Sequence, residues 1–317
     1  MLKKRSIFLL IIIIVFSTIL IGFISKSFVS KKPTVVVVLK DLHTQYWEIV
    51  KAGAEKGFRD FGIDGKVMAP SYESEEDGQE YLLKKVLKEN PDALIVSPND
   101  SSIIPFLKEF YEKDIPVLLI DTDAPWENKT SYIGTDNVDL GRMGGMLLAS
   151  QLQPGSKVAL IAGDINHPIS GDRIKGAKHS LQAAGVKIAT EKFDLPNETE
   201  QIKEVMETVL QDHPDVKGVF AETDIKALAA YEVIEEYGLT IPVIGADGIN
   251  EMIELIEEGA LPGTVAQNPY DMGYLSVENA LKVIKGENVG KNVDTGVDII
   301  IKGNAKQRLD FQKRILR

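Results

Sequence analysis

The sequence predicts an α/β fold of two lobes, each a doubly wound parallel sheet with helices on both faces. Short apolar runs rich in β-branched residues and bounded by turn residues indicate buried strands. Amphipathic stretches with helical spacing separate these runs, and such alternation is typical of parallel sheets. The series is too long for one sheet. It pauses near residues 132–137, after which a new helix and a new series of strands begin.

The expected elements follow in order along the chain. The predicted strands are residues 34–39, 93–97, 117–120, 157–161, 218–221, 242–245 and 263–266. The predicted helices include residues 46–61, 78–89, 138–151, 200–211 and 225–237. Gly238 stands where a helix C-cap is expected. Pro98, Pro116 and Pro242 stand at strand edges, where a missing N–H does least harm.

The composition disfavours several functional classes. With 44% hydrophobic and 26% charged residues, it is that of a soluble globular protein. The absence of cysteine excludes disulfides, thiolate metal sites, cysteine nucleophiles and the lipidated cysteine of bacterial lipoproteins. The net charge is −11 although residues 1–32 hold six Lys/Arg and no acid, so the rest of the chain is more acidic still. A body so acidic disfavours nucleic-acid binding.

The N-terminus predicts a membrane anchor or signal segment over residues 1–32. Lys3, Lys4 and Arg5 precede an apolar run at residues 7–24, which is long enough to cross most of a bilayer as a helix. A cleaved signal usually ends in a small-x-small site with alanine, and Ser-Lys-Ser at residues 25–27 matches this poorly. We therefore expect an uncleaved anchor rather than a cleaved signal. Lysines on the far side leave the positive-inside rule with little bias.

No motif for catalysis is present, and we predict that the protein is not an enzyme. The sequence lacks HExxH, GxSxG and Walker-type loops, and its four histidines lack metal-ligand spacing, so we expect no metal and no cofactor. Residues 141–145 (Gly-Arg-Met-Gly-Gly) lie inside a predicted helix, which favours tight helix packing over a nucleotide loop. Paired acids after several strands leave a glycoside-acting enzyme as a remote alternative.

Polar residues follow the predicted strands, at the edge where doubly wound sheets bind their ligands. They are Lys40-Asp41, Asn99-Asp100, Asp121-Thr122-Asp123, Asp164, Glu222-Thr223-Asp224, Asp247-Gly248 and Gln267-Asn268. Asp, Asn, Ser and Thr also cap helices for backbone reasons alone, and we expect about half of these residues to be caps only.

From residue 34 to about residue 302 the chain resembles the ribose-type periplasmic binding proteins, whose type I fold is shared with the ligand domains of lactose-repressor-like regulators. Each segment that carries the likeness is weak alone, but their order and spacing are specific. The segments are residues 35–40, 46–54, 115–121, 132–137 with Gly141-Arg142, 219–224, 243–248 and 264–267.

The resemblance implies two lobes joined by a three-crossing hinge, with a monosaccharide held in the cleft between them. The N-terminal lobe would comprise residues 33–135 plus 268–298, and the C-terminal lobe residues 136–267 plus 299–317. The resemblance also places the body outside the cytoplasm.

Site residues carry over by position. Tyr46 and Trp47 would stack on the apolar face of the sugar, while Asp121, Asp247 and Gln267 would bind its hydroxyls. Thr223 would take a fourth polar position, and Arg173 falls at or near the arginine position of the second lobe. Lys40, Asp41 and Asp123 complete the candidate ligand-binding set. The chemistry agrees, because a sugar needs planar polar groups and a flat aromatic, and charged partners form the stronger hydrogen bonds. The alternatives without a binding role are that Tyr46 and Trp47 belong to the hydrophobic core and that Asp247 is only a turn residue.

Three departures bear on which sugar is bound. Ribose binders usually follow the first aspartate with arginine, where this chain has Thr122. Their first loop carries a small polar residue and asparagines, where this chain has Lys40, Asp41 and Leu42, closer to the xylose binders. Thr223 replaces an asparagine. A pentose such as xylose or ribose is therefore favoured without a choice between them.

Two cellular roles remain open. The protein would deliver sugar to the membrane permease of an ABC importer, or it would signal sugar binding to a membrane histidine kinase. An uncleaved anchor and the missing lipid-bearing cysteine favour the second. A cytoplasmic repressor is discarded because a hydrophobic segment stands where the DNA-binding helices would be. The basic segment at residues 304–317 is helix-compatible, and its role is left open.

Overall fold

A computed structural model describes residues 32–70 and 78–316. The strands are β1 (Thr34–Val38), β2 (Asp64–Met68), β3 (Ala93–Val96), β4 (Val117–Ile120), β5 (Ser131–Gly134), β6 (Lys157–Ile161), β7 (Lys187–Lys192), β8 (Val216–Ala221), β9 (Val243–Asp247), β10 (Gly263–Gln267), β11 (Asn292–Asp294) and β12 (Val297–Ile300). The helices are α2 (Gln45–Phe61), α3 (Gln79–Glu89), α4 (Ile104–Tyr111), α5 (Asn137–Ala149), α6 (Pro168–Ala183), α7 (Thr199–Asp212), α8 (Asp224–Glu236), α9 (Asn250–Glu258), α10 (Pro269–Ile284) and α11 (Ala305–Ile315), with a short 3₁₀ turn at Ser101–Ile103.

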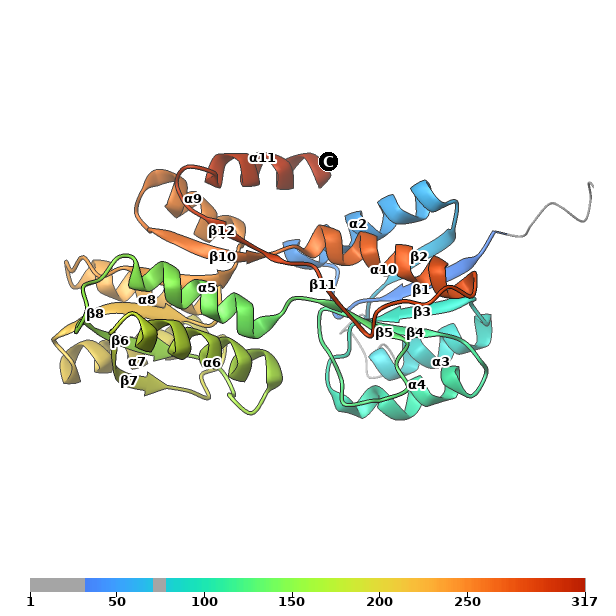
Figure 1. The fold of residues 1–317 in the computed structure, drawn as a ribbon, viewed down its shortest axis with the longest axis horizontal. Helices are drawn as coiled ribbons and strands as arrows, with labels where there is room; N and C mark the ends of the chain where they lie inside the picture. Colours follow the sequence, from blue (N-terminus) through green and yellow to red (C-terminus); the bar gives the residue numbers. More distant parts are fainter. Residues whose placement is uncertain (1–31, 71–77, 317) are drawn as a thin grey trace, which may run out of the picture.

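These elements form two lobes that lie side by side, each built on one six-stranded sheet (Figure 1). The strand order is β11-β5-β4-β3-β1-β2 in the first sheet and β12-β10-β9-β8-β6-β7 in the second. The strand pairs are parallel except for β10 with β12, which is antiparallel. The predicted fold of two doubly wound lobes is thereby confirmed.

Burial on both faces explains the apolar strands. In β1, Val35 and Val37 pack into the cluster beneath α2 and α10, whereas Val36 and Val38 pack into the cluster beneath α3 and α4. Side chains alternate between the two faces of a strand, so a sheet covered on both sides requires an apolar residue at each position. The β-branched valines also suit the pleated backbone.

The helices of each lobe cross closely where glycines face backbone. A Cβ on Gly53 of α2 would lie 2.0 Å from the carbonyl oxygen of Tyr270 in α10. In the second lobe, a Cβ on Gly141 of α5 would lie 1.9 Å from the carbonyl oxygen of Arg173 in α6. The glycines at residues 141–145 thus serve helix packing, as the sequence predicts.

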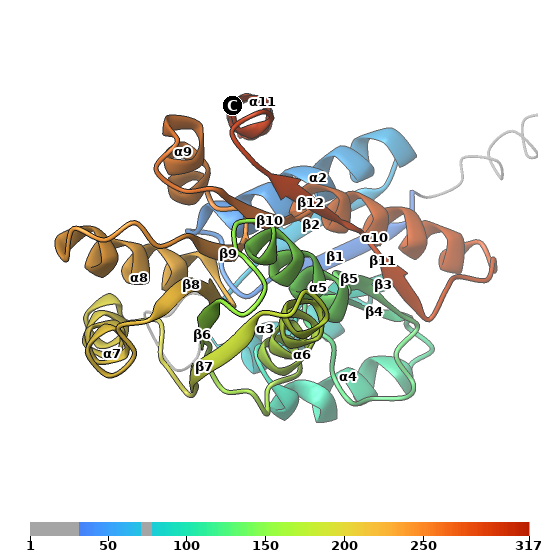
Figure 2. The same ribbon diagram turned by 60° about the vertical axis from the view of Figure 1, so that its left-hand side comes forward.

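The chain passes between the sheets three times, and hydrogen bonds join the crossings. The connections run from β5 to α5, from β10 to α10 and from β11 to β12 (Figures 1 and 2). The backbone N–H of Asp136 donates to Asp294 Oδ1 at 3.1 Å, and Asn268 Nδ2 donates to the carbonyl of Thr295 at 3.2 Å. Hydrogen bonds therefore join the three crossings into one hinge between the lobes.

The predicted membrane anchor at residues 7–24 lies outside the described residues. Within residues 32–70 and 78–316, no helix combines the length and the apolar character needed to cross a bilayer.

We predict that Gly141→Ala destabilises the second lobe. The new methyl group would meet backbone rather than a flexible side chain, so α5 and α6 must move apart. Overpacking of this kind lowers the free energy of unfolding by about 1–3 kcal/mol. Urea unfolding measures the change. Gly303→Ala is the matched control, because nothing lies within 4 Å of a Cβ there. Equal stability of the two variants would contradict the close-packing argument.

Candidate functional site

Six predicted residues meet in one hydrogen-bonded network at the carboxyl ends of the strands. Lys40 and Asp121 follow β1 and β4, while Asp247 and Gln267 end β9 and β10. Tyr46 lies in the first turn of α2, and Arg173 lies in α6. Parallel strands present their carboxyl ends at one edge, so residues far apart in sequence converge there.

The first-lobe half of the network is centred on Asp121. Tyr46 Oη donates to Asp121 Oδ1 at 2.6 Å, and Thr122 Oγ1 donates to Asp121 Oδ2 at 2.9 Å. Lys40 Nζ donates to Thr122 Oγ1 at 2.6 Å and lies 3.8 Å from Asp121 Oδ2. Lys40 therefore places a cation beside the carboxylate.

Trp47 completes this half with an aromatic surface. Its ring meets the ring of Tyr46 edge to face, with centroids 5.1 Å apart. Lys40 Nζ lies 5.9 Å from the Trp47 ring centroid, within the range of a cation–π contact. Both aromatic side chains are partly buried and pack against the first-lobe core, so the structure gives the pair a core contact as well as a place beside Asp121.

The second-lobe half is centred on a buried ion pair. Arg173 Nη1 lies 2.9 Å from Asp247 Oδ1, and the Arg173 side chain is only 3% exposed. The guanidinium also donates to Asn137 Oδ1 at 2.9 Å and to the carbonyl of Glu222 at 2.8 Å. Although burial opposes the charged form, Asp247 and Glu222 raise the pKa of Arg173. The cation is thus held in a fixed orientation.

Gln267 joins the two halves. Its Nε2 donates to Asp247 Oδ1 at 2.8 Å, and its Oε1 accepts from Thr135 Oγ1 at 2.8 Å. The same Oε1 lies 3.5 Å from Tyr46 Oη across the lobes. Burial and the charge of Asp121 raise the pKa of Tyr46 well above its usual value, so its hydroxyl stays protonated and able to donate.

Both site aspartates have unusual backbone conformations. Asp121 has φ 65° and Asp247 has φ 121°, in the half of φ space that favours glycine. Such conformations are costly for other residues, and they cluster at sites where the surroundings over-determine them. They support a reading of these aspartates as site residues rather than as turn residues alone.

Asp224 holds the turn that follows Asp247. This fully buried carboxylate accepts from the backbone N–H of Gly248 at 2.6 Å and of Ile249 at 2.9 Å. It also accepts from Thr264 Oγ1 at 2.6 Å, which ties the turn to β10. The carboxylate thereby supports the strained backbone of Asp247 from behind.

Three predicted residues make other contacts. Asp41 accepts from the N–H groups of His43 and Thr44 at 2.8 and 2.9 Å, which orders the loop before α2. Asp123 pairs with Lys129. Thr223 is the N-cap of α8 and accepts from the N–H of Lys226 at 3.4 Å. None of these contacts links them to the network.

Three residues of the network were not in the predicted set. Thr122 contacts both Asp121 and Lys40. Thr135 contacts Gln267, and Asn137 contacts Arg173. A cavity of about 290 Å³ opens beside them, lined also by Asp123 and, from α6, by Asp172. Thr135 lies in the first crossing, and Asn137 begins α5 directly after it. A polar residue at a crossing is the signal that would have found them.

A two-lobed α/β fold with polar residues of both lobes gathered beside the hinge is that of a bilobal binding protein. Residues 35–288 match the periplasmic binding protein domain, and the chain belongs to this family. The predicted resemblance is thus confirmed.

Three relatives illustrate the likeness. The ribose import binding protein RbsB of Bacillus subtilis (strain 168) is 30% identical over 270 residues, covering 85% of this chain and 87% of the relative. An ABC transporter periplasmic solute binding protein from Actinobacillus succinogenes 130z, solved with bound D-allose, is 26% identical with a TM-score of 0.78, covering 87% of this chain and 100% of that one. A carbohydrate transporter solute binding protein from Agrobacterium radiobacter, in complex with D-arabinose, is 27% identical with a TM-score of 0.76, covering 91% and 100%. These relatives are binding proteins rather than enzymes, in agreement with the prediction.

We predict that Asp224 makes stability depend on pH. Burial and the charge of Asp247 raise the pKa of Asp224 from 3.8 to about 7. The folded state therefore binds an extra proton between these values, and the free energy of unfolding falls as pH rises from about 4 to about 7. Asp224→Asn keeps an acceptor for Gly248 and Ile249 but removes the titration. The fall in unfolding free energy between about pH 4 and pH 7 should therefore be smaller in the variant than in the unmodified protein, by up to about 4 kcal/mol.

Urea unfolding at several pH values across this window measures the effect. The control is Asp212→Asn at an exposed carboxyl, which should keep the pH profile of the unmodified protein. Parallel profiles for the Asp224→Asn variant and the unmodified protein would show that Asp224 does not titrate in this window.

Proposed function

We propose that the protein binds a monosaccharide, with a pentose favoured, between its lobes and closes around it. The observation that carries the proposal is the network in which Asp121, Asp247 and Gln267 converge from both lobes beside the Tyr46–Trp47 pair. Carboxylates and amides suit the hydroxyls of a sugar, and an aromatic face suits its C–H surface.

The contacts already formed in the network are compatible with a ligand. Arg173 fixes one oxygen of Asp247, and Tyr46 fixes one oxygen of Asp121. Each carboxylate oxygen has more than one lone pair, so hydroxyl groups of a ligand can add hydrogen bonds without breaking these. Groups held in this way lose little freedom on binding, which favours affinity.

Lys40 bears on specificity. In ribose binders an arginine usually follows the first aspartate, and here Thr122 takes that place. Lys40 reaches from the end of β1 to Thr122 and lies beside Asp121, so a cation is present from another strand. We infer that this half of the site accepts a sugar in a different hydrogen-bonding pattern from that of ribose binders.

The relatives support the ligand class. RbsB of Bacillus subtilis is a ribose import protein, and the solved relatives hold D-arabinose and D-allose. Two of these sugars are pentoses and one is a hexose. We therefore propose monosaccharide binding with a pentose preferred, in the service of an ABC importer.

A second role is a sugar sensor that signals to a membrane histidine kinase. It is favoured by the apolar run at residues 7–24 and by the absence of a cysteine for lipid attachment. A tethered helix can pass a closure of the lobes to a membrane partner. Neighbouring genes for a permease or for a kinase distinguish the two roles.

We predict that Asp247→Ala abolishes sugar binding and leaves unfolding cooperative. The variant loses a charged acceptor, and hydrogen bonds to charged groups are worth about 1.5–3 kcal/mol each. Loss of two such bonds lowers the affinity by about a hundredfold or more. Isothermal titration of the full chain against a panel of pentoses and hexoses measures this, in a detergent without a sugar headgroup.

The matched control is Glu254→Ala, at an exposed carboxylate of α9. It should bind as the unmodified protein does. If the unmodified protein binds no monosaccharide of the panel, the sugar proposal is wrong. If Asp247→Ala binds normally, Asp247 is a turn residue only.

We propose further that residues 7–24 anchor the body at the outer face of the membrane. The full chain expressed in a bacterial host should sediment with the membranes at its full mass and resist carbonate extraction. Deletion of residues 1–32 should release the body. A soluble product shortened at its N-terminus would instead establish a cleaved signal.

A further inference from the structure

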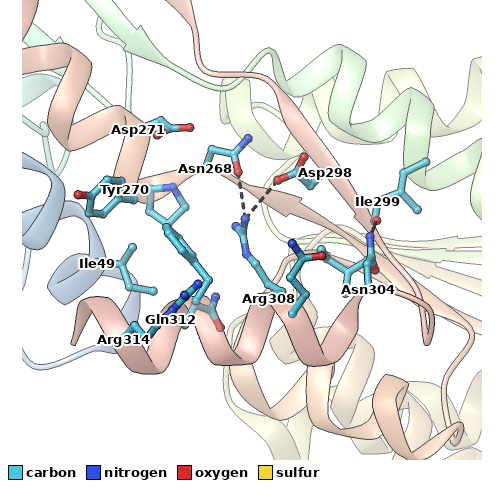
Figure 3. Close-up of a pocket in the computed structure, with 14 residues that line it drawn as sticks. Ile49, Asn268, Tyr270, Asp271, Asp298, Ile299, Asn304, Arg308, Gln312 and Arg314 are labelled. Carbon is cyan, nitrogen blue, oxygen red and sulfur yellow. Dashed lines mark hydrogen bonds and ion pairs between the residues drawn. The ribbon is translucent and has the colours of Figure 1, made fainter. Parts of the chain in front are cut away.

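Helix α11 lies beyond residues 35–288, which match the family, and it packs against α9 and reaches α2. It borders a cavity of about 510 Å³ at the hinge, lined from the first lobe by Ile49 and Tyr270 and from α11 by Arg308 and Phe311 (Figure 3). Phe311 meets the ring of Tyr270 edge to face, with centroids 5.7 Å apart.

Arg308 points from α11 toward the chain crossings (Figure 3). Its Nη2 donates to the backbone carbonyl of Gln267 at 2.6 Å. Its Nη1 donates to Asn268 Oδ1 and to Asp298 Oδ2, both at 3.2 Å. One guanidinium therefore ties the crossing that leaves β10 to the strand β12 that follows the third crossing.

A second side chain of α11 binds the backbone directly after β9. Gln312 is buried, and its Nε2 donates to the carbonyl of Gly248 at 3.3 Å. Gly248 directly follows Asp247. The helix thus binds the backbone at Gln267 and next to Asp247, two candidate ligand residues.

We propose that Arg308 is a positioning residue for the ligand cleft, which fixes the backbone of Gln267 and thereby the amide that joins the two halves of the site. The inference rests on the proposed function. The Gln267 side chain has partners in the first crossing and in the second lobe, Thr135 and Asp247, at 2.8 Å each. A small shift of its backbone would disturb both contacts. A charged donor with three acceptors resists such a shift better than a single neutral bond.

The test combines amide hydrogen exchange with sugar titration on the full chain in the same detergent. In Arg308→Ala, exchange of a peptide over residues 263–270 should accelerate by about tenfold, while a peptide over β6 stays unchanged. The affinity for the sugar identified in the panel should fall by about tenfold. Arg308→Lys should recover part of the affinity, because an ammonium cannot reproduce the planar fork. Lys306→Ala, exposed on the same helix, is the control and should match the unmodified protein.

A double-mutant cycle separates positioning from plain stability. If Arg308 acts through Gln267, Arg308→Ala should change the affinity less in a Gln267→Ala background than in the unmodified protein. A merely structural role lowers the unfolding temperature and leaves the cycle additive.

Unchanged exchange at residues 263–270, unchanged affinity of Arg308→Ala, or an additive cycle overturns the inference. Failure of the proposed function looks different. In that case the unmodified protein binds no monosaccharide, and the positioning role falls with it even where exchange responds to Arg308→Ala.

Discussion

The buried ion pair between Arg173 and Asp247 is the interaction on which the candidate site depends. Removing a guanidinium from water is expensive, and a buried pair by itself is weak evidence for stability. Here the cation is also bound by the Asn137 side chain and the Glu222 carbonyl, so its donors are directed at three points of the lobe. A cation bonded at three points is held in one orientation, and orientation is what a binding site requires.

The surrounding structure maintains this pair in a conformation that Asp247 would not adopt alone. Asp247 has φ 121°, and the turn after it is held by Asp224 through two backbone N–H groups. Gln267 Nε2 donates to the same carboxylate oxygen of Asp247 that Arg173 contacts. The helix that carries Arg173 can come close enough only because Gly141 leaves room for its backbone. Packing, backbone strain and electrostatics thus converge on one carboxyl group.

Sequence reasoning found the strands whose burial is complete and missed those at the sheet edges. Strands such as β3 and β4 are uniformly buried, and their continuous apolar runs identify them. The edge strands β2 and β7 have the sequences Asp-Gly-Lys-Val-Met and Lys-Ile-Ala-Thr-Glu-Lys, with partial exposure that breaks the apolar signal. β5 was interpreted as a pause because it stands directly at a crossing. The site follows the same logic. Residues at strand ends were predictable from topology, whereas their partners, such as Thr135 for Gln267, depend on how the chain crossings pack together.

The same contacts bear on the proposed closure of the lobes around a ligand. Each half of the network is satisfied within its own lobe, through Tyr46 with Asp121 and Arg173 with Asp247. Gln267 Oε1 accepts from Thr135 Oγ1 at 2.8 Å beside the first crossing, and Tyr46 Oη approaches the same oxygen at 3.5 Å, which is at the limit of a hydrogen bond. These contacts fall on the Gln267 amide and do not join the carboxylates of Asp121 and Asp247 directly. A ligand shifts a conformational equilibrium only by its differential contacts with the two states. A molecule that accepts and donates hydrogen bonds at Asp121 and Asp247 together supplies that difference, and one that reaches a single lobe does not.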